Sequence, residues 1–485
     1  MGTRTIRSIE VTKAITNAEQ LLNSKKKEER LTVFARATII ALLEAVTILS
    51  NRLNLDSSNS SLPSSKDPLH RNPAKKKETE TESKGERRKP GAQPGHPGTT
   101  LKKVTNPDVV ETIHIDRRTI PKGSYETIKF ETRQVFDINI SMVVTEYQAE
   151  VVVDLQGNEY VATFPPGVTR PTQYGNHTKA SSVYLSQYQL VPLERVKDYF
   201  EDQAGSEISK GSIAHFNVEA SQKLDAFVEW AKNGLQKCAV AHSDETSINV
   251  GGKTIWLHSV SNSRLTLYHP DEKRGKEAMD RMGVLPLFTG TLCHDHWKPY
   301  FKYPCTHSLC NAHHLRELQW SVEFEDQSWA KDMKALLIEI NDEKISLGSV
   351  SESNQVLFDN RYMHILTTGK LECPVTEKIK GEAGKARGRT QRSKSRNLLE
   401  RLLKYKDETL RFMRDPDVPF TNNQGERDIR MTKVQQKISG CFRSIDGANN
   451  FCRIRSYIST CKKNGFSPTE ALKLLFDGTL PAFVV

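Results

Sequence analysis

Apolar runs of strand length mark the second half of the chain, from about residue 237 onward. CAVAHSDETSINV (238–250) predicts a buried strand, and KTIWLHSVSN (253–262) and RLTLYHP (264–270) predict two more. A short helix is expected over 276–282, then a strand in GTLCHD, and then a strand running into a helix in HSLCNAHHLRELQW. Three strands, a helix, and then alternating strand and helix is the order of a ribonuclease-H-like sheet. The remaining stretch, from about 321 to 416, is mostly helical in pattern. A basic segment, KIKGEAGKARGRTQRSKSR (378–396), interrupts it, and the whole is typical of an insertion into the sheet domain.

The first half of the chain shows a different organisation. Residues 28–53 predict an amphipathic helix, which would form a coiled-coil dimer or pack on its own chain. From 56 to 103 the sequence is rich in Ser, Pro, Gly and Lys and has almost no apolar residues, which predicts a flexible linker. Its two basic clusters, Lys75–Lys77 and Arg87–Lys89, would contact phosphates or remain solvated.

Two further patterns precede the sheet domain. The β-branched residues between Thr127 and Phe164 predict a small antiparallel sheet, with a turn at Gln156–Asn158. Residues 173–222 predict helices, with Gly205 ending one and Ser209 capping the next. Two helices around a glycine turn fit either a helix-turn-helix or an ordinary helical hairpin.

Composition narrows the class of protein. The 485 residues favour several domains, and 70 Lys and Arg against 59 Asp and Glu give a net charge of +11. Such an excess favours a polyanionic partner, although it also serves solubility. The apolar run 39–49 is too short to cross a membrane, and the first residues carry no apolar signal core. All eight cysteines lie between Cys238 and Cys461, unlike a secreted disulfide framework, which predicts a cytoplasmic protein.

Three acidic residues are the candidate catalytic and metal-binding groups. Asp244 and Asp295 lie near the ends of predicted strands, and Glu426 opens a predicted helix. Carboxylates in such a cage bind two divalent ions, which activate an attacking oxygen and stabilise the leaving oxygen of a phosphodiester. Glu426 has an alternative role as the acidic partner of a capping box begun by Asn423. Glu245 should point away from Asp244, because successive strand residues face opposite sides.

Cationic residues follow Glu426 on the same predicted helix. Arg430, Lys433 and Lys437 fall on one stripe with Glu426, and Arg427 adjoins it. The stripe would hold a phosphate backbone beside the metal ions, or it is a solvated surface.

Histidine and cysteine near the acidic residues suggest secondary contacts. His294 and His296 should point away from Asp295 and act as neutral polar residues rather than metal ligands. Cys305, Cys310, His313 and His314 have zinc-compatible spacing, but a second Cys or His pair at finger-like spacing is missing. Cys310 and His313 are therefore expected to pack or hydrogen-bond beside the sheet instead. Arg316 joins Cys310 and His313 as a secondary candidate.

The motifs together resemble those of the DDE transposases of the insertion-sequence 66 family. The matching stretches run in order from about 57 to 461: SSNSSLPSSK, RRKPGAQPGHPG, YGNHTKASSVYL with PLERV, HSDET, WLH, HDHWKPY, LCNAHHLREL, TNNQGERDIRMTKVQQKISGCFRS and FCRIRSYIST. The resemblance implies a ribonuclease-H-like catalytic domain in which Asp244, Asp295 and Glu426 bind Mg²⁺ or Mn²⁺. It also implies recognition of terminal inverted repeats in double-stranded DNA, self-association on the ends and small accessory proteins. Family members commonly carry a cysteine-based zinc segment after the PGxxPGH block. Here the equivalent stretch, 114–138, has no cysteine, and zinc is not expected.

The fold class expected is therefore multidomain α/β. The expected domains are an N-terminal helical segment (1–55), the basic linker (56–104), a small β-rich segment (105–168), a helical DNA-binding segment (169–232), the first part of the core (233–320), the helical insertion (321–415) and the completion of the core (416–485). The expected activity is metal-dependent cleavage and strand transfer at the ends of a mobile element. The alternatives are an inactive, transposase-derived DNA-binding protein and a nuclease that never joins strands.

Overall fold

The computed structural model describes residues 101–374 and 392–484. The chain divides into two compact units, one ending at Asp137 and the other beginning at Ile138. The expected N-terminal helix, most of the basic linker and residues 378–391 of the basic segment lie outside the described residues.

The described part of the first unit, residues 101–137, contains no helix or strand. A pair of hydrogen bonds joins its ends: the backbone N–H of Val104 donates to Oε1 of Gln134, and Nε2 of Gln134 donates back to the carbonyl of Val104, each at 2.8 Å.

A β-hairpin opens the second unit. Strand β1 (Val151–Val153) pairs antiparallel with β2 (Glu159–Val161) around a turn at the predicted Gln156–Asn158. The wider sheet expected from Thr127 is wrong, since the described residues 127–150 form no strand. Their apolar side chains are exposed, Ile138 at 92 %, so they have no core on which a larger sheet could form.

Helices follow the hairpin, as predicted for residues 173–222. They are α3 (Asn176–Val183), a π-helical turn (Tyr184–Tyr188), α4 (Leu193–Ala204), α5 (Lys210–Gln222) and α6 (Asp225–Gln236). Gly205 ends α4 in the left-handed conformation, with φ of 61°, and the Ser209 hydroxyl caps α5 by accepting from the N–H of Ser212. Both of these predictions are confirmed.

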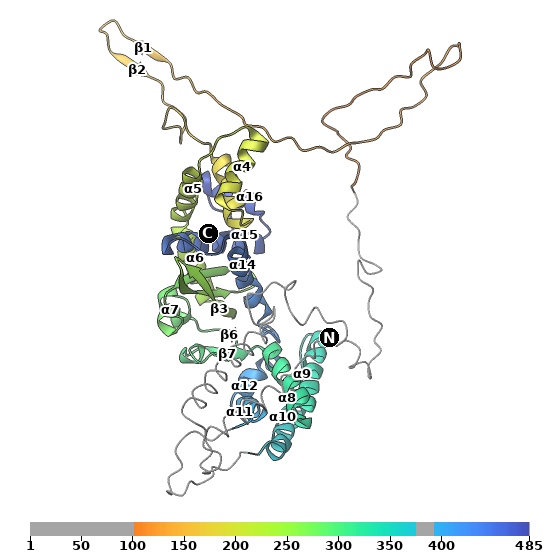
Figure 1. Ribbon diagram of the computed structural model, residues 1–485, viewed down its shortest axis with the longest axis vertical. Helices are drawn as coiled ribbons and strands as arrows, with labels where there is room; N and C mark the ends of the chain where they lie inside the picture. Colours follow the sequence, from red (N-terminus) through yellow and green to blue (C-terminus); the bar gives the residue numbers. More distant parts are fainter. Residues whose placement is uncertain (1–100, 375–391, 485) are drawn as a thin grey trace, which may run out of the picture. The chain divides into compact units, whose positions relative to one another are not determined.

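A five-stranded mixed sheet forms the centre of the second unit (Figure 1). Its strands are β3 (Val240–Val250), β4 (Lys253–Ser261), β5 (Thr266–Asp271), β6 (Thr291–His294) and β7 (Thr306–Leu309). The order is β5-β4-β3-β6-β7. The first three strands are antiparallel neighbours, and β6 and β7 run parallel to β3. Helix α7 (Lys276–Met282) and two short 3₁₀ turns (Leu285–Leu287 and Tyr300–Lys302) connect the strands. The predicted sequence of strands and helix is confirmed.

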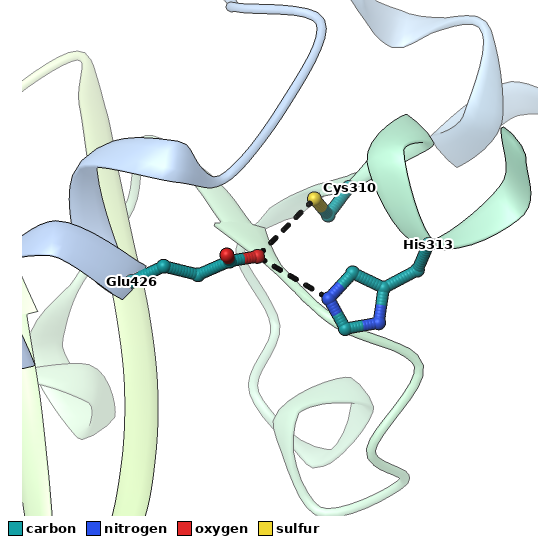
Figure 2. A group of neighbouring side chains, drawn as sticks. All are labelled: Cys310, His313 and Glu426. Atoms are coloured by element: carbon teal, nitrogen blue, oxygen red, sulfur yellow. Dashed lines mark hydrogen bonds and ion pairs between the residues drawn. The ribbon is translucent and has the colours of Figure 1, made fainter. Parts of the chain in front are cut away.

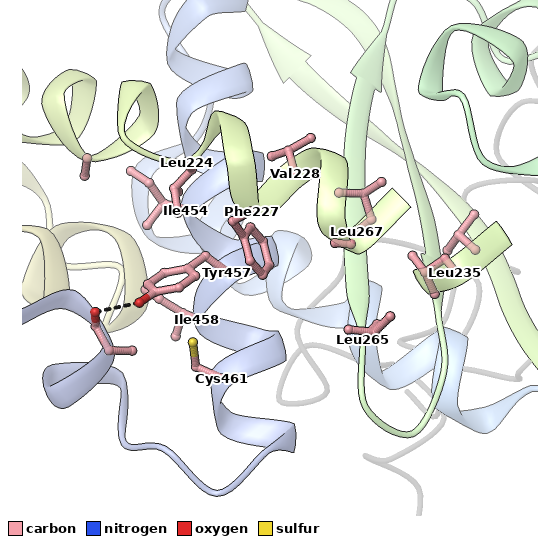
Figure 3. Close-up of a cluster of buried hydrophobic side chains, with 14 of the residues drawn as sticks. Leu224, Phe227, Val228, Leu235, Leu265, Leu267, Ile454, Tyr457, Ile458 and Cys461 are labelled. Carbon is pink, nitrogen blue, oxygen red and sulfur yellow. Dashed lines mark hydrogen bonds between the residues drawn. The ribbon is translucent and has the colours of Figure 1, made fainter. Parts of the chain in front are cut away.

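Alternation along the strands separates two hydrophobic cores. Leu267 packs with α6 and with α15 (Ile445–Lys463), whereas the next residue, Tyr268, packs in a second cluster with α14 (Asn423–Ser439). Figure 3 shows the first cluster, in which Phe227 of α6 lies against Tyr457 of α15 with ring centroids 5.1 Å apart. Helix α16 (Pro468–Phe476) completes this core through Leu472.

A helical insertion separates β7 from α14. It comprises α8 (Asn311–Glu325), α9 (Ser328–Leu347), α10 (Glu352–Glu372), α11 (Lys394–Lys404), α12 (Lys406–Thr409) and α13 (Arg411–Arg414). Helices α8, α9 and α10 lie side by side (Figure 1). Their shared core centres on Trp329, and it reaches the sheet through Cys293 of β6. The insertion predicted between the second and third acidic residues is confirmed as helical.

Candidate functional site

Asp244 and Asp295 occupy matching places on two neighbouring parallel strands. His242 of β3 is paired with Cys293 of β6, and each aspartate lies two residues further along its own chain. Because parallel neighbours lie about 5 Å apart and side chains repeat every second residue, the register puts the two carboxylates on the same face of the sheet, Asp244 within β3 and Asp295 directly after β6. A backbone hydrogen bond from Trp297 to Oδ1 of Asp295, 2.9 Å long, fixes the second of them.

The electrostatic surroundings of Asp244 reflect this crowding of acids. Burial raises the pKa of Asp244, the nearby charges of Glu245, Asp295 and Glu426 raise it further, and it reaches about 7. The backbone N–H of Glu245 donates to Asp244 Oδ1 at 2.9 Å, which opposes the shift only in part. Asp295 and Glu426 therefore both lie near enough to Asp244 to act on its charge.

Glu245 is held on the other face of β3, as strand alternation predicts. Its carboxylate accepts from the Tyr300 hydroxyl at 2.6 Å and from the Arg274 guanidinium at 2.8 Å. The Arg274 guanidinium lies over two indole rings, 4.5 Å from that of Trp256 and 4.6 Å from that of Trp297. Glu245 is only 2 % exposed, so its partners leave it no free position in a cage around Asp244.

Glu426 lies in the first turn of α14 and meets two side chains from the start of α8 (Figure 2). Oε1 of Glu426 lies 3.3 Å from Nε2 of His313 and 3.9 Å from Sγ of Cys310. The hydrogen bond with His313 lowers the pKa of Glu426, and the charge of Arg316 lowers it further, against the effect of burial. One ligand atom from each of Cys310, His313 and Glu426 lies within 4.8 Å of the others.

The capping-box alternative for Glu426 is wrong. The residue before α14 is Asn422, and its backbone N–H donates to Cys310 Sγ at 3.1 Å rather than to Glu426. Glu426 turns instead toward His313, so its carboxylate is directed at the start of α8 and not at the first turn of its own helix.

Asn422 is a structural link that the sequence reasoning missed. Its Oδ1 lies 2.8 Å from Nδ1 of His242, and its Nδ2 donates to the carbonyl of Ser243 at 2.8 Å. Asn422 thereby ties the start of the Glu426 helix to the two residues before Asp244. The repeated asparagine in TNNQGE is the only sequence signal for this contact.

Comparison with known proteins now decides the family. The family described as Transposase IS66 family matches residues 171–450, more than half of the chain. The chain belongs to the IS66 transposase family. The matched region contains the sheet, the helical insertion and all three acidic residues.

One curated relative of this IS66-family chain is similar over a short segment. It is the "Uncharacterized protein y4jO" of Sinorhizobium fredii, 40 % identical over 70 residues. The segment covers 14 % of this chain and 22 % of that protein, whose printed name assigns no activity. In the described residues, no helix is long and apolar enough to cross a membrane.

The two histidines beside Asp295 in this IS66-family chain bond to other histidines. Nε2 of His294 lies 3.0 Å from Nδ1 of His307, and Nε2 of His296 lies 2.7 Å from Nε2 of His314. Burial lowers the pKa of His294 to about 3 and that of His296 to about 4, so both rings are neutral at pH 7. These contacts agree with the predicted role as neutral polar neighbours.

The predicted cationic stripe on α14 divides into two kinds of residue. Arg427, Arg430 and Lys437 are exposed. Lys433 is half-buried and donates to the carbonyl of Ser247 at 3.0 Å, and burial lowers its pKa. Its ammonium group therefore joins α14 to β3, and the exposed cations flank that contact.

Proposed function

We propose that this chain is a DNA transposase that cuts the ends of a mobile element and joins them to target DNA by metal-dependent phosphoryl transfer. The observation that carries this proposal is the matched placement of Asp244 and Asp295, two residues beyond a paired position on neighbouring parallel strands. Membership of the IS66 transposase family and the carboxylate of Glu426 across from α8 support the same reading.

The order of the sheet supports a ribonuclease-H-like core. An antiparallel β5-β4-β3 ribbon is continued by two parallel strands, β6 and β7, with β3 at the centre. Asp244 lies within β3 rather than near its end as expected from the sequence, whereas Asp295 directly follows β6. We infer that these two aspartates and Glu426 of α14 form one acidic site.

The donor set fits Mg²⁺ or Mn²⁺, since carboxylate oxygens are the ligands that these ions prefer. The raised pKa of Asp244 has neighbouring negative charges among its causes, and a bound cation would reverse their effect. Asp244, Asp295 and Glu426 are the residues that would hold the ions. When bound, the two ions supply Lewis acidity that activates the attacking oxygen and neutralises charge on the phosphodiester.

The protein's own residues supply orientation and charge. The Trp297 N–H holds Asp295, while His313 and Cys310 hold Glu426, and these contacts support a role for both carboxylates in orienting the reaction. The exposed Arg427, Arg430 and Lys437 would bind phosphates of double-stranded DNA along α14. Self-association on the element ends and small accessory proteins are part of the proposal.

A cleavage and joining assay tests the reaction class. Labelled DNA carrying the inverted repeat of the parent element is incubated with the full chain and a target plasmid, with Mg²⁺ or with EDTA. The proposal expects nicking at the element end and a joined product, both only with Mg²⁺. Cleavage without a joined product would indicate a nuclease instead of a transposase. Binding to the element end without cleavage would indicate an inactive DNA-binding protein.

A further inference from the structure

A basic pocket lies on the insertion, next to the acidic residues. Its volume is about 1010 Å³, and it opens between α8, α11 and the segment that follows Asp295. His296 and Lys298 line it from that segment, Arg316 and Trp320 line it from α8, and α11 forms the opposite wall.

The pocket holds more positive than negative charge. Four exposed cations line it, namely Lys298, Arg316, Lys394 and Lys404, and none of them forms an ion pair within residues 101–374 and 392–484.

Two further arginines line the same pocket and are paired, Arg392 with Glu400 and Arg401 with Glu317. The Nε of Arg401 is nevertheless buried without a hydrogen-bond acceptor among the described residues. Four uncompensated cations in one hollow favour an anionic ligand with several charges.

Aromatic surface accompanies the charge. Trp320 stacks on Phe324 with centroids 5.4 Å apart and planes at 19°, and Nζ of Lys394 lies 4.5 Å from the Trp320 ring centroid. The ring of Tyr405 also lines the pocket, 5.2 Å from the ring of His296 between centroids, and Nζ of Lys404 lies 5.0 Å from the Tyr405 centroid. Cations that track a backbone beside rings on which bases stack are the means by which proteins bind single-stranded nucleic acid.

Two of the lining residues are near candidate catalytic residues in the chain. Lys298 follows Asp295 by three residues, and Arg316 lies on the same helix as His313, the hydrogen-bond partner of Glu426. The charge of Arg316 acts on Glu426 itself. The pocket therefore lies on the side of the insertion from which Arg316 acts on Glu426.

We propose that the pocket binds unpaired nucleotides of the DNA strand beside the phosphodiester that is cut, with phosphates on Lys394 and Lys404 and a base on Trp320. This inference rests on the proposed function for the identity of the strand. A double helix does not suit the pocket, since its bases are stacked inside and offer no face to an aromatic ring. Its volume is that of sites for compact organic ligands, large enough for a few nucleotides.

Fluorescence anisotropy with a 5′-labelled single strand of twelve thymidines, in EDTA, tests the pocket without catalysis. Trp320→Ala should weaken binding by about 5-fold or more, since stacking contributes roughly 1–3 kcal/mol per base, and Trp320→Phe should restore most of the affinity. The double variant Lys394→Ala/Lys404→Ala should lose two phosphate contacts. The slope of log K against log salt concentration should therefore become shallower by about 1.4. The matched control is Lys331→Ala, an exposed lysine of α9 outside the pocket, which should bind as wild type does.

A crosslink locates the strand and separates this inference from the proposed function. A single strand carrying 5-iododeoxyuridine should, on irradiation, attach to the α8 peptide that contains Trp320. Crosslinks found only in other peptides would contradict the proposed binding of single-stranded DNA in the pocket, even if the chain cuts and joins DNA. Wild-type affinity of the Trp320 and Lys394/Lys404 variants for the single strand would contradict it equally. Conversely, a wild-type protein that crosslinks at Trp320 but never cuts DNA would support single-strand binding in the pocket and contradict the proposed cleavage and joining.

Discussion

The side-chain amide of Asn422 donates a hydrogen bond to the carbonyl oxygen of Ser243 at 2.8 Å, between positions 179 residues apart. The amide oxygen of the same side chain lies 2.8 Å from Nδ1 of His242, and the backbone N–H of Asn422 donates to Sγ of Cys310. One buried residue thus fixes the start of the Glu426 helix against the strand of Asp244 and the helix of His313. The distance between the first and third acidic residues depends on this link.

Replacing Asn422 should therefore affect both stability and activity. Asn422→Ala leaves His242 and the Ser243 carbonyl without their partner in a buried setting, and we expect a loss of about 1–3 kcal/mol in the free energy of unfolding. DNA cleavage should fall by roughly 10-fold to 100-fold, because Glu426 loses its placement. Urea unfolding and the cleavage assay measure the two effects. Asn423→Ala, at the exposed next position, serves as the control, and equal behaviour of the two variants would refute the link.

Gly290 controls how closely β6 approaches β3. A Cβ at this position would lie 2.4 Å from the carbonyl oxygen of Cys238 and 2.5 Å from that of Ala239, both of them backbone atoms that cannot move aside. Gly290→Ala should cost about 1–3 kcal/mol of stability and should impair cleavage by shifting Asp295 relative to Asp244. Thermal unfolding measures the loss of stability, and the rate of DNA cleavage measures the effect on activity.

A second glycine provides the contrast for Gly290. In α5, a Cβ on Gly211 would meet only the Ser209 hydroxyl at an ordinary 3.6 Å. Gly211→Ala should be neutral or stabilise the protein by up to about 1 kcal/mol, since alanine favours the helix. If Gly290→Ala were as well tolerated as Gly211→Ala, the close approach of β6 and β3 would not be required.

The carboxylate of Asp271 should make stability depend on pH in the acid range. Burial alone would raise its pKa, but Arg281 donates two hydrogen bonds to it, at 2.7 and 2.6 Å, and the pKa falls to about 2. A pKa that is lower in the folded state than in the unfolded state stabilises the protein at every pH above the unfolded-state pKa, which is near 4. This contribution is lost as the pH falls toward 2. It amounts to about 2 kcal/mol at neutral pH.

The comparison of wild type with Asp271→Asn isolates that contribution. The difference between their free energies of unfolding in urea should be constant from pH 7 to pH 5 and should narrow progressively below pH 4. Asp332→Asn, which changes an exposed carboxylate of α9 in the same way, is the control for the substitution itself. A difference that widens on acidification would contradict the assignment.

The sequence predicted the strands of the sheet domain because each is an apolar run of the right length between turn signals. It placed both aspartates near strand ends, which holds for Asp295 but not for Asp244, because β3 continues for six residues beyond Asp244. It overestimated the β-structure between Thr127 and Glu150, because β-branched composition reports propensity and not the presence of a packing partner.

The sequence could not predict side-chain contacts between residues that are far apart in the chain. The stripe on α14 did not reveal that Lys433 would reach the carbonyl of Ser247, since helical spacing does not say which face meets the sheet. The link from Asn422 to Ser243 and the hydrogen bond from Tyr300 to Glu245 each depend on the completed fold. The pairing of Glu426 with His313 likewise arises only when α14 and α8 are brought together.

The most direct test of the account measures cleavage of element-end DNA by Asp244→Asn, Asp295→Asn and Glu426→Gln in Mg²⁺ and in Mn²⁺. Asp446→Asn, at an exposed position in the first turn of α15, is the control. The account predicts that each of the three variants binds the end as wild type does but cleaves it at least about 100-fold more slowly, while the control is unaffected. Near-wild-type cleavage by any one of the three would contradict the assignment of that residue to the metal-binding triad.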